Sequence, residues 1–270
     1  MTNPSESPLP PAIDLPPSLL ARTDGPVAVL TLNRPDKRNA LNDETVLGIE
    51  RFFTNLPGEV RSVVLAATGG HFSAGLDLSE MGEHDTISGV EHSRMWHRAL
   101  DAVEFGPVPV VCALHGAVVG GGLELAAAAH LRVAERSTFY ALPEGMRGIF
   151  VGGGAAVRVP RLIGVARMTD LMLTGRRYDA VEGHAVGLSQ YLVEDGTGLD
   201  RALELAQLVA RNAPQTNYAI VQALPRIAEA NPREGYFMEA MIAAIAQGTD
   251  DAKERMQAFL DGRAEKVTDR

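Results

Sequence analysis

The sequence predicts an α/β fold, because short apolar strands alternate with glycine-rich loops and helical segments along most of the chain. Such repeated units place their loops on one side of a sheet, where a site can form. Residues 1–18 are rich in proline and predict a flexible arm, whereas residues 199–262 hold helix formers without a strand pattern. We therefore divide the chain into this arm, an α/β core over residues 19–198 and a helical C-terminal region over residues 199–270.

The core opens with a pair of strands over residues 19–32. Apolar residues alternate there, and Asp24-Gly25 is a typical hairpin turn. The segment 33–41, which contains a proline, breaks this pattern as a turn. Asn42 then predicts the start of a helix over residues 43–56, because its side chain can accept a backbone N–H bond and apolar residues follow at helical spacing.

The same pattern continues through the middle of the core. Residues 61–67 form a short β-branched segment, typical of a strand, that ends at Thr68-Gly69-Gly70. A polar, irregular stretch then leads to a helix expected around residues 90–103. Strand, glycine-rich loop and helix are expected again over residues 108–129 and 131–155.

The most informative segment surrounds the triple glycine Gly120–Gly122. An apolar run over residues 108–115 leads into it, and an alanine-rich helix follows. Glycines let the backbone approach a ligand closely, and the first amides of a helix are unpaired donors at the positive end of its dipole. Such a site suits a developing oxyanion; tight packing of strand on helix, without a ligand, is the alternative. The segment fits neither the G-x-G-x-x-G dinucleotide motif nor a P-loop.

Two glutamates border these glycine-rich loops. Glu124 lies one helical step beyond the triple glycine, and Glu144 follows Leu142-Pro143. Taken singly, Glu124 is also explained by the helix dipole, and Glu144 by an exposed turn. Each, however, follows a buried-looking strand, so we expect both carboxylates to face one crevice.

Composition and motifs argue against several classes of protein. With a formal net charge of −9, the chain lacks the basic character of a nucleic-acid binder. An anionic ligand must therefore be held by local groups. The seven histidines show no metal-ligand spacing, and no G-x-S-x-G elbow supports a Ser-His-Asp triad. We therefore expect neither a nucleic-acid partner nor a metal site.

The sequence also indicates a cytoplasmic location. Its first residues lack a basic segment followed by an apolar one, so we expect no secretory signal. No uncharged apolar run reaches transmembrane length, so we expect no membrane partner. The single cysteine, Cys112, lies in an apolar run, which indicates core packing in a reducing compartment.

Taken in order, four segments resemble the crotonase superfamily, also called the enoyl-CoA hydratase/isomerase family. They are residues 27–41, similar to the family's opening strand and CoA-binding turn; 71–78, similar to its first oxyanion loop; 115–125, similar to its second; and 173–180, a segment that typically follows. Each fragment alone is a weak signal, but their joint order is specific. The resemblance implies a spiral of β-β-α turns and a C-terminal helical region that builds homotrimers, often paired into homohexamers.

The resemblance also assigns roles to residues. The backbone N–H groups of Leu76 and Gly121 fall at the family's oxyanion hole, which holds the thioester carbonyl as it becomes an enolate. Glu124 and Glu144 fall at the two hydratase glutamates. The positions at which the family holds CoA, largely through the backbone, are Lys37, Arg38, Ala40, Ala74, Asp77 and Leu78.

Two departures from the family pattern concern the core and the acyl pocket. His130 stands where many relatives have an aspartate, so we expect a different buried pairing there. The loop 148–154 replaces a commoner proline-containing glycine loop, which we expect to reshape the acyl pocket. Met81, Trp96 and Leu100, from the variable region before the second oxyanion loop, are expected to shape that pocket as well.

Retention of both glutamates implies an enoyl-CoA hydratase of fatty acid metabolism. In that reaction Glu124 helps to activate water for attack at Cβ, and Glu144 exchanges a proton with Cα. CoA is part of the substrate, and no separate cofactor is implied. Two alternatives remain: double-bond isomerisation, which shuttles a proton without adding water, and a non-catalytic acyl-CoA binder.

Overall fold

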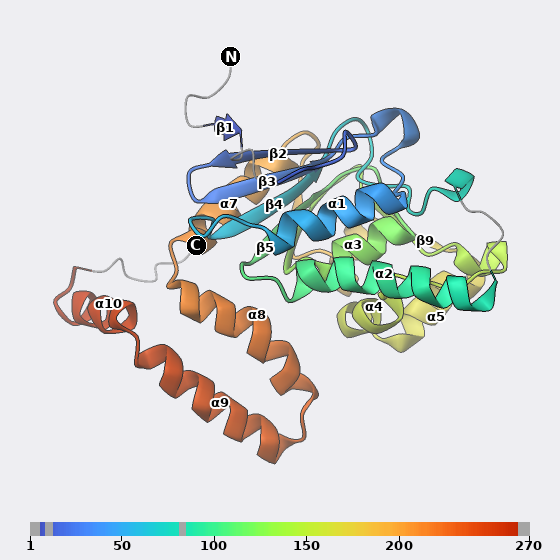
Figure 1. Ribbon diagram of the computed structural model, residues 1–270. Helices are drawn as coiled ribbons and strands as arrows, with labels where there is room; N and C mark the ends of the chain where they lie inside the picture. Colours follow the sequence, from blue (N-terminus) through green and yellow to red (C-terminus); the bar gives the residue numbers. More distant parts are fainter. Residues whose placement is uncertain (1–5, 9–12, 81–84, 264–270) are drawn as a thin grey trace. The chain divides into compact units, whose positions relative to one another are not determined.

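The computed structural model describes residues 6–8, 13–80 and 85–263 of the chain (Figure 1). The chain forms two compact units, which divide after Val209. Most of the expected N-terminal arm, residues 1–5 and 9–12, lies outside the described residues, as does Met81. Within that arm, Glu6–Pro8 forms the short strand β1, which pairs with the edge of the main sheet.

A seven-stranded sheet forms the base of the first unit, in the order β1-β2-β3-β4-β5-β7-β10. Its further strands are β2 (Leu19–Asp24), β3 (Val27–Leu32), β4 (Ser62–Ala67), β5 (Val110–Leu114), β7 (Leu131–Glu135) and β10 (Tyr191–Val193). The expected hairpin at Asp24-Gly25 is confirmed, since β2 and β3 pair antiparallel and Asp24 lies opposite Val27. From β3 onward neighbouring strands are parallel. Parallel strands are usually covered on both faces by other parts of the protein, which explains why the central strands are nearly continuous apolar runs.

A second, three-stranded sheet carries the chain toward the site. Its strands are β6 (Ala117–Val119), β8 (Phe139–Ala141) and β9 (Arg177–Asp179). Before the triple glycine the sequence predicted one strand, but the structure has two: β5 ends at Leu114, the chain turns at Gly116 with φ +55°, and β6 joins the second sheet. The stretch 131–155 likewise contains β8 and the short helix η3 (Glu144–Arg147) before its glycine-rich loop. Apolar content alone does not show where a chain changes sheets.

Helices pack beside these sheets. They are α1 (Asp43–Thr54), α2 (Thr86–Glu104), α3 (Gly121–Ala128), α4 (Ala155–Ile163), α5 (Val165–Thr174), α6 (Ala180–Val186) and α7 (Gly198–Ala210), with the short 3₁₀ helices η1 (Pro35–Lys37) and η2 (Leu78–Glu80). The predicted cap is confirmed, because the Asn42 side chain accepts the Thr45 N–H at 3.1 Å. Helix α2 begins earlier than expected, where Asp85 accepts the Ser88 N–H at 2.8 Å. Helices α1 and α2 lie side by side, and α3 contacts α2 and α4 (Figure 1).

The core of the first unit is apolar. Helix α1 buries Val46, Ile49, Phe52 and Phe53, and the two phenylalanine rings meet edge to face at 5.2 Å between centroids. Cys112 is fully buried in β5, and burial raises the pKa of its thiol, so its expected packing role is confirmed. Helix α7 is bonded to the sheet: the Ser62 hydroxyl donates to the Ala206 carbonyl at 2.9 Å.

The second unit is helical, as the sequence predicted. It contains α8 (Pro214–Glu229), α9 (Pro232–Gln247) and α10 (Asp250–Leu260), with no strand between residues 210 and 263. Asn231 and Thr249 cap α9 and α10 by accepting the N–H groups of Glu234 and Ala252. Within the described ranges, no helix has the length and apolar character needed to cross a membrane.

His130 ties the end of α2 to the start of β5. Its Nδ1 accepts the Val110 N–H at 2.9 Å, and its Nε2 lies 3.0 Å from the Glu104 carbonyl oxygen. A nitrogen that accepts carries no proton, so the ring is neutral with its proton on Nε2. Burial lowers the pKa of His130 from 6.5 to about 4. His130 therefore contributes a neutral ring to the core, with one hydrogen bond at each ring nitrogen.

We predict that this neutral ring makes stability depend on pH. Because the folded pKa of about 4 lies below the value of 6.5, the contribution is fully present above pH 6.5 and is lost as pH falls toward 4. The difference between these two pKa values corresponds to about 3 kcal/mol in the free energy of unfolding. Urea unfolding between pH 7.5 and 4.5 should show this loss, and His130→Asn should show a shallower one. Equal slopes in both proteins would contradict the assignment.

Candidate functional site

The turn 33–41 and the loop 71–78 are bonded into one surface. The Ala74 N–H donates to the Arg38 carbonyl at 2.9 Å, the Leu41 N–H to the Gly75 carbonyl at 2.8 Å, and the Asp77 N–H to the Leu41 carbonyl at 2.9 Å. These bonds bring together the six residues that the sequence pointed to as CoA-binding: Lys37, Arg38, Ala40, Ala74, Asp77 and Leu78. Lys37, Arg38 and Leu78 are exposed, whereas Asp77 is buried.

One residue that the sequence analysis missed, Asn39, holds this turn. Asn39 is buried in a left-handed conformation, and its Nδ2 donates to the carbonyls of Thr68 and His71 at 2.8 Å each. Asn39 Oδ1 also accepts the Arg34 N–H at 2.7 Å. Asparagine tolerates a positive φ better than most residues, and this preference was the one signal in the sequence for a tight turn at Asn39. The carbonyl partners, however, come from a distant part of the sequence.

The Asp77 side chain belongs to the same framework. It accepts the Ser79 hydroxyl at 2.6 Å and the Arg34 guanidinium at 2.9 Å. The Ser79 hydroxyl bond, followed by a second Ser79 bond and Arg34, holds the pKa of Asp77 below its usual value. The carboxylate is therefore occupied within the protein, and the Asp77 N–H is bonded to Leu41 as well.

The backbone amides of Leu76 and Gly121 lie next to each other. A β-carbon placed at Gly121 would be 3.3 Å from the Leu76 nitrogen, and one placed at Gly75 would be 3.0 Å from the Gly121 nitrogen. Leu41 pairs with the Gly75 carbonyl and the Asp77 N–H, so the Leu76 N–H points away from that bridge. No hydrogen bond from either amide is found within the described part of the chain. Gly121 also begins α3, at the positive end of its dipole.

The Glu124 carboxylate is buried against a second glycine-rich turn. Its side chain is 4% exposed, and Oε1 accepts the Gly153 N–H at 2.7 Å and the Ala155 N–H at 3.0 Å. Burial raises the pKa of Glu124, while these amides and the charge of Arg158 oppose the rise. The carboxylate is thus held in place while its proton affinity is increased.

The Glu144 carboxylate lies against the first residue of the triple glycine, Gly120. Its side chain is 7% exposed, and a β-carbon at Gly120 would be only 2.8 Å from Oε1. Its Oε2 is buried and finds no hydrogen-bond partner among the described residues. Burial raises the pKa of Glu144, and the negative charge of Glu124 raises it further. The two carboxylates therefore interact electrostatically, although each contacts a different glycine turn.

The indole of Trp96 forms a wall between the two glycine turns. β-Carbons placed at Gly121 and Gly153 would lie 3.0 Å and 2.9 Å from its ring carbons. Trp96 is buried, and its Nε1 has no partner in the described structure. Leu100, which the sequence also placed at an acyl pocket, is buried in the same hydrophobic core cluster as Trp96. Trp96 therefore lies beside both glycine turns.

The loop 148–154 has two different ends. At its glycine end, the Gly153 N–H donates a hydrogen bond to the Glu124 carboxylate. Its Ile149 and Phe150 side chains are exposed and line a separate apolar cavity of about 400 Å³ with Met168 and Leu173.

This arrangement can support proton transfer at an activated carbonyl. Two adjacent amides without partners can stabilise an oxyanion, and two buried carboxyls with raised pKa values can accept and donate protons. The described residues contain no cluster of three or more histidine, cysteine or acidic side chains suited to a metal ion.

Comparison with known proteins identifies the family. The sequence model of the enoyl-CoA hydratase/isomerase family matches residues 22–270. The chain belongs to this family. The match spans both units, so the predicted crotonase-like fold is confirmed.

Individual members of the enoyl-CoA hydratase/isomerase family resemble the chain over nearly its full length. The protein named enoyl-CoA hydratase EchA19 of Mycobacterium tuberculosis is 31% identical, over 92% of this chain and 95% of its own. The short-chain-enoyl-CoA hydratase of Clostridium acetobutylicum is 30% identical, over 91% and 95%. A crystal structure from Rhodopseudomonas palustris, provisionally assigned as an enoyl-CoA hydratase, is 57% identical with a TM-score of 0.90, over 92% and 97%.

We predict that the loop 71–78 requires glycine at position 75. Its φ of +92° is unfavourable for other residues, and a β-carbon would lie 2.6 Å from the Val119 carbonyl oxygen. Gly75→Ala should therefore lower the free energy of unfolding by more than about 1 kcal/mol. Gly89, in open space on α2, is the matched control.

The control Gly89→Ala should raise the free energy of unfolding by about 0.5–1 kcal/mol, because alanine favours a helix more than glycine does. Urea denaturation of the two variants measures the difference. Equal stability of Gly75→Ala and Gly89→Ala would show that the loop accommodates a side chain.

Proposed function

We propose that the protein is an enoyl-CoA hydratase, which adds water across the 2,3 double bond of an enoyl-CoA thioester. The observation that carries this proposal is the electrostatic coupling of two buried carboxylates, Glu124 at the turn of Gly153 and Glu144 at Gly120. Addition of water needs a group that accepts a proton from water and a group that gives one to carbon. Two coupled carboxyls supply both.

In the proposed reaction the Leu76 and Gly121 amides donate to the thioester oxygen. Glu124 accepts a proton as the water oxygen bonds to Cβ, and negative charge moves onto the thioester oxygen as an enolate. Glu144 then donates a proton to Cα, and the carbonyl re-forms. One proton leaves water and one reaches carbon, so the carboxyl pair keeps its total proton count. Because the two carboxyls are coupled, their titration belongs to the pair and not to either residue alone.

We further propose that the surface around residues 37–41 and 74–78 binds the CoA part of the substrate. The exposed cations Lys37 and Arg38 suit its phosphates, and local cations can hold an anion although the net charge is −9. Ala40, Ala74, Asp77 and Leu78 would contribute through their backbones. CoA enters as part of the substrate, and the proposal needs no separate cofactor.

We also propose that the protein forms homotrimers or homohexamers in the cytoplasm. Exposed aromatic and aliphatic side chains on α9, such as Tyr236, Phe237 and Ile245, support association with other copies. The single, fully buried Cys112 supports a reducing compartment.

We predict that neutralising either glutamate abolishes most hydration. Glu144→Gln and Glu124→Gln keep the side-chain size but remove the ionisable group, so each should lower kcat for crotonyl-CoA by at least about a hundredfold. Binding of a CoA ester should persist, because the Leu76 and Gly121 amides are unchanged. Steady-state kinetics with product identification checks this. Wild-type rates in both variants, or a shifted alkene in place of 3-hydroxyacyl-CoA, would overturn the hydratase proposal.

We predict that Lys37 and Arg38 strengthen CoA binding. Lys37→Ala/Arg38→Ala should weaken binding of free CoA in calorimetry and reduce its salt dependence, because two cations near phosphates are lost. Arg94→Ala/Arg98→Ala, which removes the same charge from α2, is the matched control and should bind CoA as the wild type does. The same affinity in all three proteins would refute this placement.

A further inference from the structure

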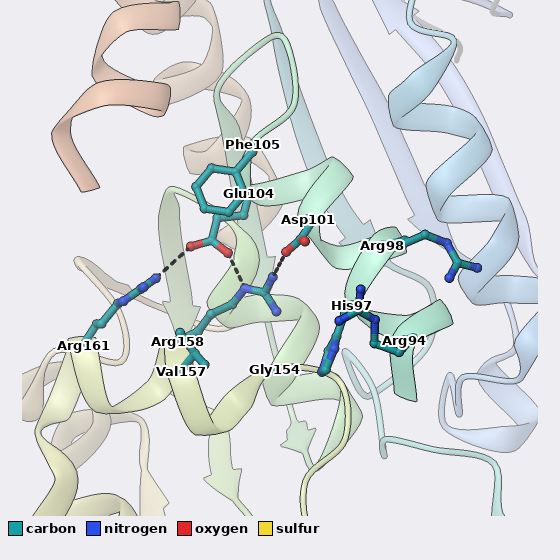
Figure 2. A pocket seen from close by; sticks show the side chains of 10 residues that line it. All are labelled: Arg94, His97, Arg98, Asp101, Glu104, Phe105, Gly154, Val157, Arg158 and Arg161. Atoms are coloured by element: carbon teal, nitrogen blue, oxygen red, sulfur yellow. Dashed lines mark hydrogen bonds and ion pairs between the residues drawn. The ribbon is translucent and has the colours of Figure 1, made fainter. Parts of the chain in front are cut away.

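Arg158 is a buried cation bonded on three sides. It lies on α4, is 5% exposed, and borders a cavity of about 290 Å³. Figure 2 shows its guanidinium between two acids of α2: Nη2 lies 2.7 Å from Asp101 Oδ1, and Nε 2.5 Å from Glu104 Oε2. The third side is a backbone contact, since Nη1 donates to the Gly153 carbonyl at 2.9 Å. Most of the bonding capacity of Arg158 is therefore used to connect α2 with the glycine turn.

The bonded glycine turn is the one that holds Glu124. Gly153 accepts Arg158 through its carbonyl and donates to Glu124 Oε1 through its N–H. Ala155 donates to the same oxygen, and Gly154 between them has φ +108°. A β-carbon at Gly154 would collide with Arg158 Nη1. The turn is thus clamped between the guanidinium and the carboxylate.

The charges around this clamp affect Glu124. Glu144, from η3, is the acid that couples to Glu124, and Arg158 is the cation that favours its ionised form. Asp101 and Glu104, from α2, and Arg161, which pairs with Glu104 at 3.4 Å, surround Arg158 in turn. Loss of the Arg158 charge would leave Glu124 with its burial and with Glu144, both of which favour the protonated form.

We propose that Arg158 is a positioning residue for the hydration reaction: it clamps residues 153–155 and thereby fixes the place and the charge of the Glu124 carboxylate. This inference rests on the proposed function. A planar guanidinium suits the task because it presents donors in three directions. A lysine at this position keeps the charge, but its compact ammonium does not reproduce the planar fork that reaches both acids and the Gly153 carbonyl.

The test uses two substitutions at this position and one control. Arg158→Lys keeps the buried charge and weakens the clamp, whereas Arg158→Met removes both. Arg161→Met, on the same helix, removes another partner of Glu104 and leaves the bond to Gly153 intact. Thermal unfolding identifies which variants fold. If Arg158→Met does not fold, Arg158→Lys carries the test.

Kinetics with crotonyl-CoA gives the first result. In Arg158→Lys and Arg158→Met we expect kcat to fall by at least about tenfold, because Glu124 is misplaced. KM should change by less than about twofold, because the substrate loses no contact. In Arg158→Met the acid limb of the kcat profile should also move to higher pH. Arg161→Met should match the wild type. Wild-type kcat and pH profile in folded Arg158 variants would overturn the inference.

A titration independent of turnover separates this inference from the proposed function. Carbon NMR of protein labelled at the glutamate carboxyls, with Glu124→Gln as the assignment reference, reports the Glu124 midpoint. We expect a higher midpoint in Arg158→Met than in the wild type. A shifted midpoint in a protein that hydrates no enoyl-CoA would keep the clamp and reject the hydratase. Normal hydration with an unmoved midpoint and unchanged kcat would reject the clamp.

Discussion

Burial of Glu124 is the constraint on which the site depends. A carboxylate removed from water must be paired or hydrogen-bonded, and here backbone N–H groups of residues 153 and 155 do this. The turn that carries those amides is bonded to Arg158 through the Gly153 carbonyl. Arg158 is itself buried and needs acids from α2. One buried carboxylate thus connects α2, α3 and α4.

Close approach of backbone segments is the second requirement. The Leu76 and Gly121 amides are neighbours because Gly75 and Gly121 lack side chains. The Glu144 carboxylate reaches the same turn because Gly120 lacks a side chain as well. The indole of Trp96 fills the space that remains between Gly121 and Gly153. The triple glycine therefore serves tight packing and the candidate site together, so the two explanations considered for it are not exclusive.

The proposed CoA surface depends on a different kind of support. Side chains of Arg34 and Asn39 hold the turn 33–41 against the loop that follows β4, and Asp77 completes this framework. None of these three side chains is left to serve a ligand through its main polar groups. The exposed Lys37 and Arg38 are carried by that turn, next to the loop that leads to the Leu76 amide. The turn thereby links the proposed CoA surface to the loop 71–78 that carries the Leu76 amide.

The sequence by itself determined the local features of this protein. The hairpin at Asp24-Gly25, the Asn42 cap and the apolar strands follow from contacts between near neighbours in the chain, and the ordered motifs indicated the family. Only the tertiary structure decided which distant groups meet. The move of the chain from β5 into the second sheet, the neutral ring of His130 and the ion pairs of Arg158 with Asp101 and Glu104 all depend on partners far away in sequence. Burial and hydrogen-bond pairing of these groups are properties of the packed molecule, and no local pattern of residues encodes them.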